Sequence, residues 1–451
     1  MLRQRNMTGA TTKNNVLDRA KDRLIAGELD QANRLYREVL GREPRNPAAL
    51  NGLGLVAGAA GNLRAAADLF KRAIAEQPGE PEFHNNLGIA LVRLNNSPGA
   101  RKAFEQVVAL DPTNVWALTN MGTLHETERQ LDQAIVAYKR ALAIDPHAPT
   151  ARANLANIYR TEVPGWHFTM MNDDKRNRAY DDAIRRLVPG RGVLDIGTGA
   201  GLLAMMAARA GAQWVTTCES NRVVADVARD ILVANDLAPS INLVGKHSTA
   251  LVLGVDLPRR ADLLVCEIFG STLINEELLP TLEHARANLL QPDAIVVPRR
   301  ASMIGCLVGG AALGAYFFAD KAVGFSVARF NEFAPPNLGM RLGQIAHEVL
   351  SADFTIFDFD LGQAKFTPEQ RRIDVVATRH GRCFGIAQWI RLDLAEGIIY
   401  ENRPSAGAEA DSWAHMVHRF DAPIDLRPGD RLEVLARHDR FQLTISRVHS
   451  D

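Results

Sequence analysis

The chain has 451 residues and a mass of 49.4 kDa, a length that predicts several domains. Lysine plus arginine and aspartate plus glutamate both total 52, so the formal net charge is zero. This balance argues against a general nucleic-acid binder, because such proteins carry a basic excess. The four cysteines lie far apart without a CxxC pair, so they predict neither a zinc site nor a disulfide framework, and a reducing cytoplasm is the expected location.

The first 15 residues are polar and lack the apolar core of a signal peptide, so we expect a disordered tail over residues 1–15. An uncharged stretch, residues 303–319, has the minimum length of a membrane-spanning helix. Its glycines and alanines and the charges that flank it favour a buried strand that runs into a glycine-rich loop. We therefore predict no membrane span.

Four kinds of residue recur every 34 positions in the N-terminal third of the chain. They are the prolines Pro44, Pro78, Pro112 and Pro146, the alanines Ala32, Ala66, Ala100 and Ala134, the aromatics Tyr36, Phe70, Phe104 and Tyr138, and the glycines Gly54, Gly88 and Gly122. Small residues allow two helices to approach closely, aromatic rings fill the space between them, and a proline ends the second helix. One such hairpin cannot bury its apolar face alone, so the units must stack.

This pattern resembles the tetratricopeptide repeat, with four units over about residues 16–147 and a capping helix, TARANLANIYR, that extends the all-α solenoid to residue 160. The resemblance implies a concave surface that holds a protein or peptide partner. A structural spacer and an oligomerisation surface are the alternatives.

A strand–turn–helix–strand pattern begins after residue 191. VLDIG is a short apolar strand, GTGAG is a glycine-rich turn, LLAMMAARAGA is a helix, and the strand WVTTCE ends in Glu219, 24 residues after Asp195. An acid at the end of the second strand is typical of a nucleoside-binding site. Gly197, Gly199 and Gly201 would allow a ligand to lie against the main chain, and Glu219 would bind the ribose hydroxyls.

The turn reads DIGTGAG rather than G-x-G-x-x-G, so it resembles motif I of the class I methyltransferases that bind S-adenosyl-L-methionine. The positively charged methionine end of that cofactor favours a nearby carboxylate, which Asp195 supplies. An NAD-dependent oxidoreductase is the alternative.

Two glutamates indicate which kind of substrate the site binds. Glu267 ends the strand ADLLVCE, and Glu276 follows nine residues later across a Gly-Ser-Thr turn. Paired carboxylates can catalyse glycoside hydrolysis, but beside a methyl donor they indicate a cationic substrate. A guanidinium keeps its proton, and its five N–H donors match two carboxylates. Such a clamp would orient one nitrogen toward the methyl group, so positioning and electrostatics would supply most of the catalysis.

This segment resembles the double-glutamate hairpin of the protein arginine N-methyltransferases, and the resemblance covers about residues 161–451. HFTMMNDDKRNRAY is similar to the family's helix that closes over the cofactor, which implies that His167 and Met170 line the site and that Arg176 pairs with the cofactor carboxylate. GKHSTALV is similar to the segment that contacts adenine, which implies roles for His247 and Ser248.

The sequence departs from the family near the C-terminus. DSWAHMVHRF resembles the threonine-histidine-tryptophan loop, but Asp411 and Ser412 replace the Thr-His pair, and only Trp413 remains as a substrate-side residue. The catalytic segments look most like the divergent branch that makes monomethylarginine, whereas the N-terminal repeats look like a branch that makes symmetric dimethylarginine.

We therefore expect a multidomain protein with the repeats over 16–160, an α/β Rossmann-like methyltransferase domain over 161–299 and a β-barrel-like domain over 300–451. By resemblance, an arm over about 309–342 docks on a partner subunit, which predicts a homodimer; an internal dimer-like contact made by the repeats is the alternative. The predicted function is S-adenosylmethionine-dependent methylation of protein arginine, with the repeats recruiting substrate or partner. A methyltransferase of a small cationic metabolite and a catalytically weak scaffold are the alternatives. No metal, nucleic-acid or membrane binding is predicted.

Overall fold

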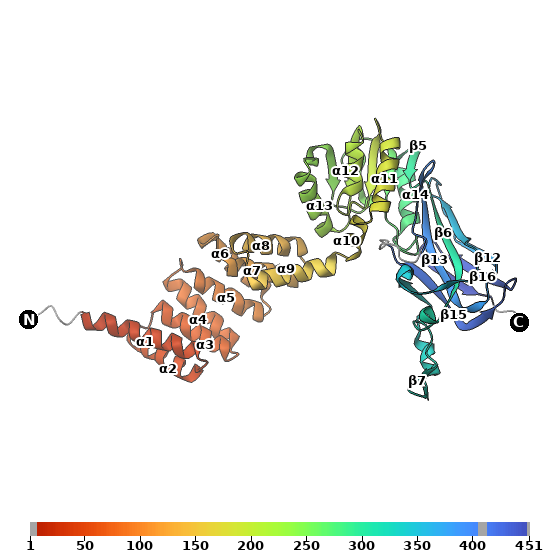
Figure 1. Cartoon of the computed structure of the whole chain (residues 1–451). Coiled ribbons are helices and arrows are strands. Elements are labelled where there is room, and N and C mark those ends of the chain that lie inside the picture. Colours follow the sequence, from red (N-terminus) through yellow and green to blue (C-terminus); the bar gives the residue numbers. More distant parts are fainter. Residues whose placement is uncertain (1–6, 405–412, 449–451) are drawn as a thin grey trace, which may run out of the picture. The chain divides into compact units, whose positions relative to one another are not determined.

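The computed structural model describes residues 7–404 and 413–448, and the chain divides into two compact units, residues 1–162 and 163–451 (Figure 1). The described part of the first unit is helical. Its elements are α1 (Met7–Ile25), α2 (Leu29–Arg42), α3 (Pro47–Ala59), α4 (Leu63–Glu76), α5 (Pro81–Arg93), α6 (Ser97–Leu110), α7 (Val115–Thr127), α8 (Leu131–Ile144) and α9 (Pro149–Glu162). Successive helices pack as hairpins, α1 with α2, α3 with α4, α5 with α6 and α7 with α8, and α9 packs against α7 and α8.

The N-terminus differs from the sequence prediction. We expected a disordered tail over 1–15, but α1 begins at Met7 and residues 7–15 belong to it. These residues contain no proline and continue directly into the rest of the helix, so nothing in the local sequence ends it sooner. Residues 1–6 lie outside the described part of the chain.

The 34-residue pattern forms the hairpin contacts that the sequence predicts. A Cβ atom placed on each repeated glycine would lie 2.4 Å from a ring carbon of the aromatic residue that faces it. The pairs are Gly54–Phe70, Gly88–Phe104 and Gly122–Tyr138. The second helix of the first repeat ends at Arg42, two residues before Pro44, and the later repeats follow the same rule. The tetratricopeptide prediction is confirmed.

Gly88→Ala should lower the free energy of unfolding by ~1–3 kcal/mol, because its Cβ would overlap the buried Phe104 ring. Gly41→Ala is the matched control, since a Cβ at this exposed helical position meets no atom within 4 Å. That control should be neutral or more stable by up to ~1 kcal/mol. Urea unfolding of the full chain, followed by circular dichroism, measures both changes. Equal transition midpoints for the two variants would contradict the packing argument.

The second unit begins with a parallel five-stranded sheet. Its strands are β1 (Gly192–Ile196), β2 (Trp214–Cys218), β3 (Ile241–Val244), β4 (Ala261–Cys266) and β5 (Leu290–Val297), in the order β3-β2-β1-β4-β5. The helices that pack on or beside it are α11 (Asp174–Leu187), α12 (Leu202–Arg209), α13 (Arg222–Ala234) and α14 (Leu278–Asn288). The strand order reverses between β1 and β4, so a ligand crevice is expected at the carboxyl ends of these two strands.

Antiparallel sheets follow in the C-terminal part of this unit. The larger sheet contains β6 (Arg300–Gly309), β9 (Asn337–Met340), β10 (Glu348–Val349), β11 (Phe354–Asp360), β13 (Gly381–Ala395), β14 (Ile398–Glu401) and β15 (His415–Leu426). The smaller one contains β12 (Glu369–Val376), β16 (Arg431–His438) and β17 (Leu443–Arg447). One continuous apolar core joins them to the parallel sheet. The expected fold class, a helical solenoid followed by α/β and β-sheet domains, is confirmed.

The uncharged stretch 303–319 is a strand and a turn, as the sequence predicts. Its first residues belong to β6, which is buried along most of its length, and Gly310 then turns the chain with φ +102° into the short helix α15 (Ala311–Gly314). Among the described residues, no helix combines the length and the apolar character needed to cross a bilayer.

A small hairpin of β7 (Lys321–Ala322) and β8 (Phe325–Ser326) extends from the antiparallel sheets (Figure 1). Both ends of the predicted arm are anchored, because Leu313 and Phe317 are buried on one side and Met340 lies in β9 on the other. The large apolar side chains between the anchors are exposed. They are Val323, Phe325, Phe330 and Phe333, with exposed fractions of 98%, 75%, 70% and 78%.

Candidate active site

The glycine-rich turn joins β1 to α12. Gly197, Gly199 and Gly201 have φ values of +87°, +51° and +82°, a region that residues with a Cβ rarely adopt. The main-chain N–H groups of Gly197 and Thr198 both donate to the carbonyl oxygen of Cys218 at 3.1 Å. These bonds hold the turn against the carboxyl end of β2.

Glu219 follows β2 and is bound by the same turn. Its Oε2 accepts from the N–H of Gly199 at 3.1 Å, and its Oε1 accepts from the N–H of Asn221 at 2.8 Å. Burial raises the pKa of this carboxyl, and the main-chain donors oppose that rise. Both carboxylate oxygens are therefore fixed at the edge of the glycine turn, with lone pairs that remain for hydroxyl donors.

Asp195 is fully buried within β1. Its Oδ2 accepts from the Thr217 hydroxyl at 2.7 Å, while its Oδ1 has no hydrogen-bond partner among the described residues. Burial raises its pKa to about 7. A buried carboxylate oxygen without a donor is unfavourable, so this atom is available to a polar ligand.

The short helix α10 (Trp166–Met171) lies beside the turn. The Trp166 and His167 rings stack with centroids 3.9 Å apart, and a Cβ on Gly199 would lie 3.9 Å from His167 Nδ1. Burial lowers the pKa of His167. Met170 is half-buried on the same helix. The helix thus brings His167 next to the glycine turn, as the sequence resemblance implies.

A buried ion pair joins α11 to the end of β4. Arg176 Nη2 donates to Glu267 Oε2, and the two side chains are 4% and 3% exposed. Arg176 Nη1 donates to Asn177 Oδ1 at 2.6 Å. Arg176 Nε and Glu267 Oε1 have no partner among the described residues. The sequence resemblance implies that Arg176 binds the cofactor carboxylate, whereas the partner that the structure gives it is Glu267.

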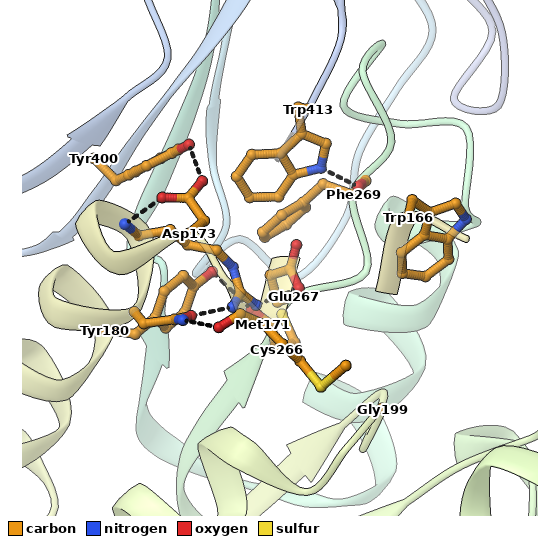
Figure 2. A network of polar contacts seen from close by, with 12 residues as sticks. Trp166, Met171, Asp173, Tyr180, Gly199, Cys266, Glu267, Phe269, Tyr400 and Trp413 are labelled. Atoms are coloured by element: carbon orange, nitrogen blue, oxygen red, sulfur yellow. Dashed lines mark hydrogen bonds and ion pairs between the residues drawn. The ribbon is translucent and has the colours of Figure 1, made fainter. Parts of the chain in front are cut away.

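Asp173 positions that arginine. Its Oδ1 accepts from the N–H of Arg176 at 2.9 Å and so caps α11, while its Oδ2 accepts from the hydroxyl of Tyr400 at 2.9 Å (Figure 2). Tyr400 belongs to β14, so a strand of the antiparallel domain fixes the start of α11. Burial raises the pKa of Glu267, and the charge on Arg176 opposes that rise.

Glu276 lies in the loop after Glu267 and is exposed, so one glutamate of the pair is deep and the other is open to solvent. Partial desolvation raises the pKa of Glu276, and the charge on Glu276 contributes to the raised pKa of Glu267. The segment that follows β4 thus carries both glutamates of the sequence prediction.

Side chains from the antiparallel domain bind the main chain of this loop. Trp413 is buried, and its Nε1 donates to the carbonyl oxygen of Phe269 at 2.9 Å (Figure 2). Gln388 Nε2 donates to the carbonyl oxygen of Ser271 at 2.8 Å, and its Oε1 lies 3.0 Å from His418 Nε2. Burial lowers the pKa of His418 to about 4, so the neutral imidazole donates this bond.

Sequence reasoning identified Trp413 but missed Gln388, Tyr400 and Asp173. No spacing or motif marks Gln388 or Tyr400, because strand pairing brings them to the site from distant positions. Asp173 carried a local signal, since it lies directly before a helical pattern, as N-cap residues do. Asp411 and Ser412, which replace the Thr-His pair, lie outside the described residues.

His247 and Ser248 follow β3, where a short 3-10 turn spans Ser248–Ala250. Ser248 is buried, and His247 is exposed with its Nδ1 2.7 Å from Thr249 Oγ1. Because β3 runs parallel to β2, these residues lie at the same edge of the sheet as Glu219.

The unpartnered buried atoms test whether the site fits S-adenosylmethionine. They are Asp195 Oδ1, Glu267 Oε1 and Arg176 Nε. The cofactor carries a positive sulfonium and ammonium, a negative carboxylate and two ribose hydroxyls. Asp195 Oδ1 and Glu219 offer carboxylate acceptors to the positive groups and the hydroxyls, and Arg176 Nε offers a donor to the carboxylate, while Glu267 Oε1 is left over. The residues present fit the cofactor.

The sequence matches the tetratricopeptide repeat family over residues 17–81 and 53–115, and a TPR repeat family over residues 130–161. Residues 179–295 match the family of the ribosomal protein L11 methyltransferase (PrmA). An arginine N(omega)-methyltransferase from Streptomyces achromogenes subsp. streptozoticus is 38% identical over 286 residues, which cover 63% of this chain and 79% of that protein. The chain belongs to the protein arginine N-methyltransferase family. It is an enzyme of this S-adenosylmethionine-dependent class.

A protein arginine N-methyltransferase 7 from Drosophila grimshawi is 36% identical to this methyltransferase over 322 residues, which cover 61% of this chain and 45% of that protein. The chain thus spans less than half of that relative. The solved Trypanosoma brucei PRMT1 enzyme-prozyme heterotetrameric complex with AdoHcy has a TM-score of 0.54 and 22% identity, covering 63% of this chain and 98% of that one. At this identity the likeness concerns the fold.

Gln388→Met should lower kcat of this methyltransferase by about 10- to 100-fold, since it removes a bond that holds the glutamate loop in place. Affinity for S-adenosylmethionine, measured by calorimetry, should change little, which separates loop positioning from general loss of structure. Gln370→Met on β12 is the matched control, because this glutamine is exposed. An unchanged kcat, or an equal loss in the control, would contradict the positioning role.

Proposed function

We propose that this methyltransferase transfers a methyl group to a guanidinium nitrogen of arginine within proteins, and that Glu267 and Glu276 hold that guanidinium. The observation that carries the proposal is the unpartnered Oε1 of Glu267, whose side chain is 3% exposed and lies at the carboxyl edge of the parallel sheet. A buried carboxylate with one unpartnered oxygen needs an N–H donor, and a substrate guanidinium supplies one.

The cofactor would be held by groups at the ends of β1 and β2. Glu219 would accept hydrogen bonds from the ribose hydroxyls, Asp195 would face the positive end, and Arg176 would donate to the carboxylate through its unpartnered Nε. We also assign His167 and Met170 to its cover, and His247 and Ser248 to its adenine side. When bound, S-adenosylmethionine supplies an electrophilic methyl group.

The two glutamates would bind the substrate guanidinium from different depths, because Glu267 is buried and Glu276 is exposed. Glu267 is fixed by Arg176 through one oxygen and would accept from the substrate through the other. Glu276, on the exposed side, would accept a second N–H. Two carboxylates on one side of a planar guanidinium stabilise positive charge there, which leaves the remaining nitrogen better able to attack. Trp413 and Gln388 hold the loop that carries these carboxylates, so they act through position.

The substrate class has two candidates. The repeats support a protein substrate or partner, since stacked helical hairpins provide extended binding surfaces. Free arginine is the second candidate, because the relative that the chain covers to 79% is named an arginine N(omega)-methyltransferase, without reference to protein.

Labelled S-adenosylmethionine distinguishes these candidates when it is incubated separately with a glycine- and arginine-rich protein and with free arginine. Acid hydrolysis and separation of the amino acids then identify the methylated product. We expect labelled methylarginine in the protein. Glu267→Gln and Glu276→Gln should each lower transfer by about 100-fold or more, because each removes a charged acceptor.

Glu277→Gln is the matched control, since this exposed neighbour should leave transfer close to the parent value. Glu267→Gln leaves Arg176 buried without its charged partner, so circular dichroism must show that this variant is folded. Glu276 is exposed, so Glu276→Gln carries no such risk of unfolding. Label in free arginine alone would favour the second candidate. Cofactor binding without any transfer in the parent would favour the catalytically weak scaffold and reject the proposal.

The exposed arm supports a homodimer. Phe325 lies on the β7–β8 hairpin, and Phe330 and Phe333 lie in the 3-10 helix Ala328–Phe333 that follows it. Their own unit leaves all three largely uncovered, and exposed apolar side chains of this kind are typical of a subunit contact. We propose that the arm docks on a second copy of the chain. Sedimentation equilibrium should give twice the chain mass for the parent and a monomer for a Phe325→Ser, Phe330→Ser double variant. A monomeric parent would contradict the proposal.

A further inference from the structure

Gln388 is a polar residue in an apolar row of β13. It is fully buried, and its neighbours in the row, Ile386 and Ile390, belong to the apolar core that the antiparallel domain shares with the parallel sheet. Successive side chains of a strand alternate between its two faces, so these three side chains share the face that packs against this core. A buried amide is unfavourable unless its polar atoms are paired. The partners of Gln388 therefore explain how the row holds a polar residue.

His418 on β15 contacts Gln388 from the neighbouring strand. The register places Ile386 opposite His418, so Gln388, two residues further along β13, is a diagonal neighbour of His418 on the same face. His418 Nε2 lies 3.0 Å from Gln388 Oε1, and His418 is only 2% exposed. Burial lowers the pKa of His418 to about 4, so at physiological pH the ring is neutral and carries one N–H.

The carbonyl oxygen of Ser271 determines which way the Gln388 amide points. A carbonyl oxygen only accepts hydrogen bonds, so the amide must present its NH2 group there, and Nε2 donates to that oxygen at 2.8 Å. The amide oxygen then faces His418 and needs a donor, so the ring carries its proton on Nε2. The other tautomer would favour the reversed amide, which would place two oxygens against each other at Ser271.

We propose that His418 is a positioning residue for methyl transfer, because it fixes the Gln388 amide that holds the main chain of the glutamate loop (residues 268–275). Ser271 lies four residues after Glu267 and five before Glu276, so a shift of its carbonyl group moves the main chain that joins the two glutamates. Without the imidazole N–H, the amide oxygen would be buried without a donor, and that cost would favour rotation of the amide away from Ser271.

The core itself does not require this polar pair. Replacing both partners of a buried hydrogen bond by apolar groups of similar shape is often nearly neutral for stability. Phe420, two residues after His418, already belongs to the same apolar core. The double variant Gln388→Met, His418→Phe should therefore unfold in urea close to the parent midpoint, while its methyl transfer is slow.

This inference rests on the proposed function only in taking Glu267 and Glu276 as the groups whose placement limits methyl transfer. The hold of His418 and Gln388 on the loop does not depend on what the glutamates bind.

A double-mutant cycle on the full chain tests the proposal. His418→Phe should lower kcat by about tenfold, because the buried amide oxygen loses its donor. In the Gln388→Met background the same change should lower kcat by at most about twofold more, since residues that act through one contact are not additive. Affinity for S-adenosylmethionine should stay close to that of the parent in all variants. An unchanged kcat in His418→Phe, or two losses that multiply, would overturn the proposal.

Two further variants separate positioning from packing. His418→Gln supplies an amide N–H in place of the imidazole N–H, so its kcat should lie within about threefold of the parent value. His438→Phe is the matched control, because His438 is similarly buried on β16, packs edge-on against Phe357 and has no hydrogen-bond partner among the described residues. It should retain the parent kcat. An equal loss in this control, or no recovery in His418→Gln, would indicate packing alone and reject the proposal.

Hydrogen exchange followed by mass spectrometry tests the hold on the loop without any methyl transfer. Exchange over residues 268–275 should be faster in His418→Phe and in Gln388→Met, to a similar extent, and parent-like in His438→Phe. Parent-like exchange in His418→Phe would overturn the proposal. Full transfer by Glu276→Gln, together with faster exchange in His418→Phe, would reject the proposed role of the glutamates and keep His418 as the residue that holds the loop.

Discussion

The buried ion pair between Arg176 and Glu267 is the constraint on which the second unit depends. Two charges removed from water are unfavourable unless each satisfies the other, and the loss of one partner typically costs ~3–5 kcal/mol. The ion pair therefore holds the start of α11 against the end of β4. The ion pair uses only one oxygen of Glu267. The other oxygen, Oε1, can therefore still accept a hydrogen bond from a ligand.

Side chains of the antiparallel domain stabilise the segments that carry this ion pair. Tyr400 fixes Asp173, which caps α11, and Trp413 and Gln388 bind the carbonyl groups of the glutamate loop. A loop of irregular backbone has no ladder of its own, so its carbonyls need donors from neighbours. The geometry of the glutamate loop thus depends on both domains of the unit, because donors from the antiparallel domain bind its main chain.

On the proposed function, the catalytic unit would select its substrate by charge. Glu267 is almost fully buried, so water screens its charge little, and a cationic guanidinium would be favoured over neutral groups. The repeats would add a surface for a protein partner, as stacked helical hairpins do in general.

Features that depend on local or periodic chemistry are predictable from the sequence alone. The 34-residue pattern specified the repeats, because each glycine must face an aromatic ring, and the glycine turn specified the nucleoside site, because only glycine adopts those φ values freely. The glutamate pair was also evident from its place after a strand. Three contacts are evident only in the folded chain: the ion pair of Arg176 with Glu267, the capping of α11 by Asp173 with Tyr400, and the support of the loop by Gln388. These contacts join residues that are far apart in the sequence and that strand pairing and domain packing bring together. No local spacing in the sequence indicates such contacts.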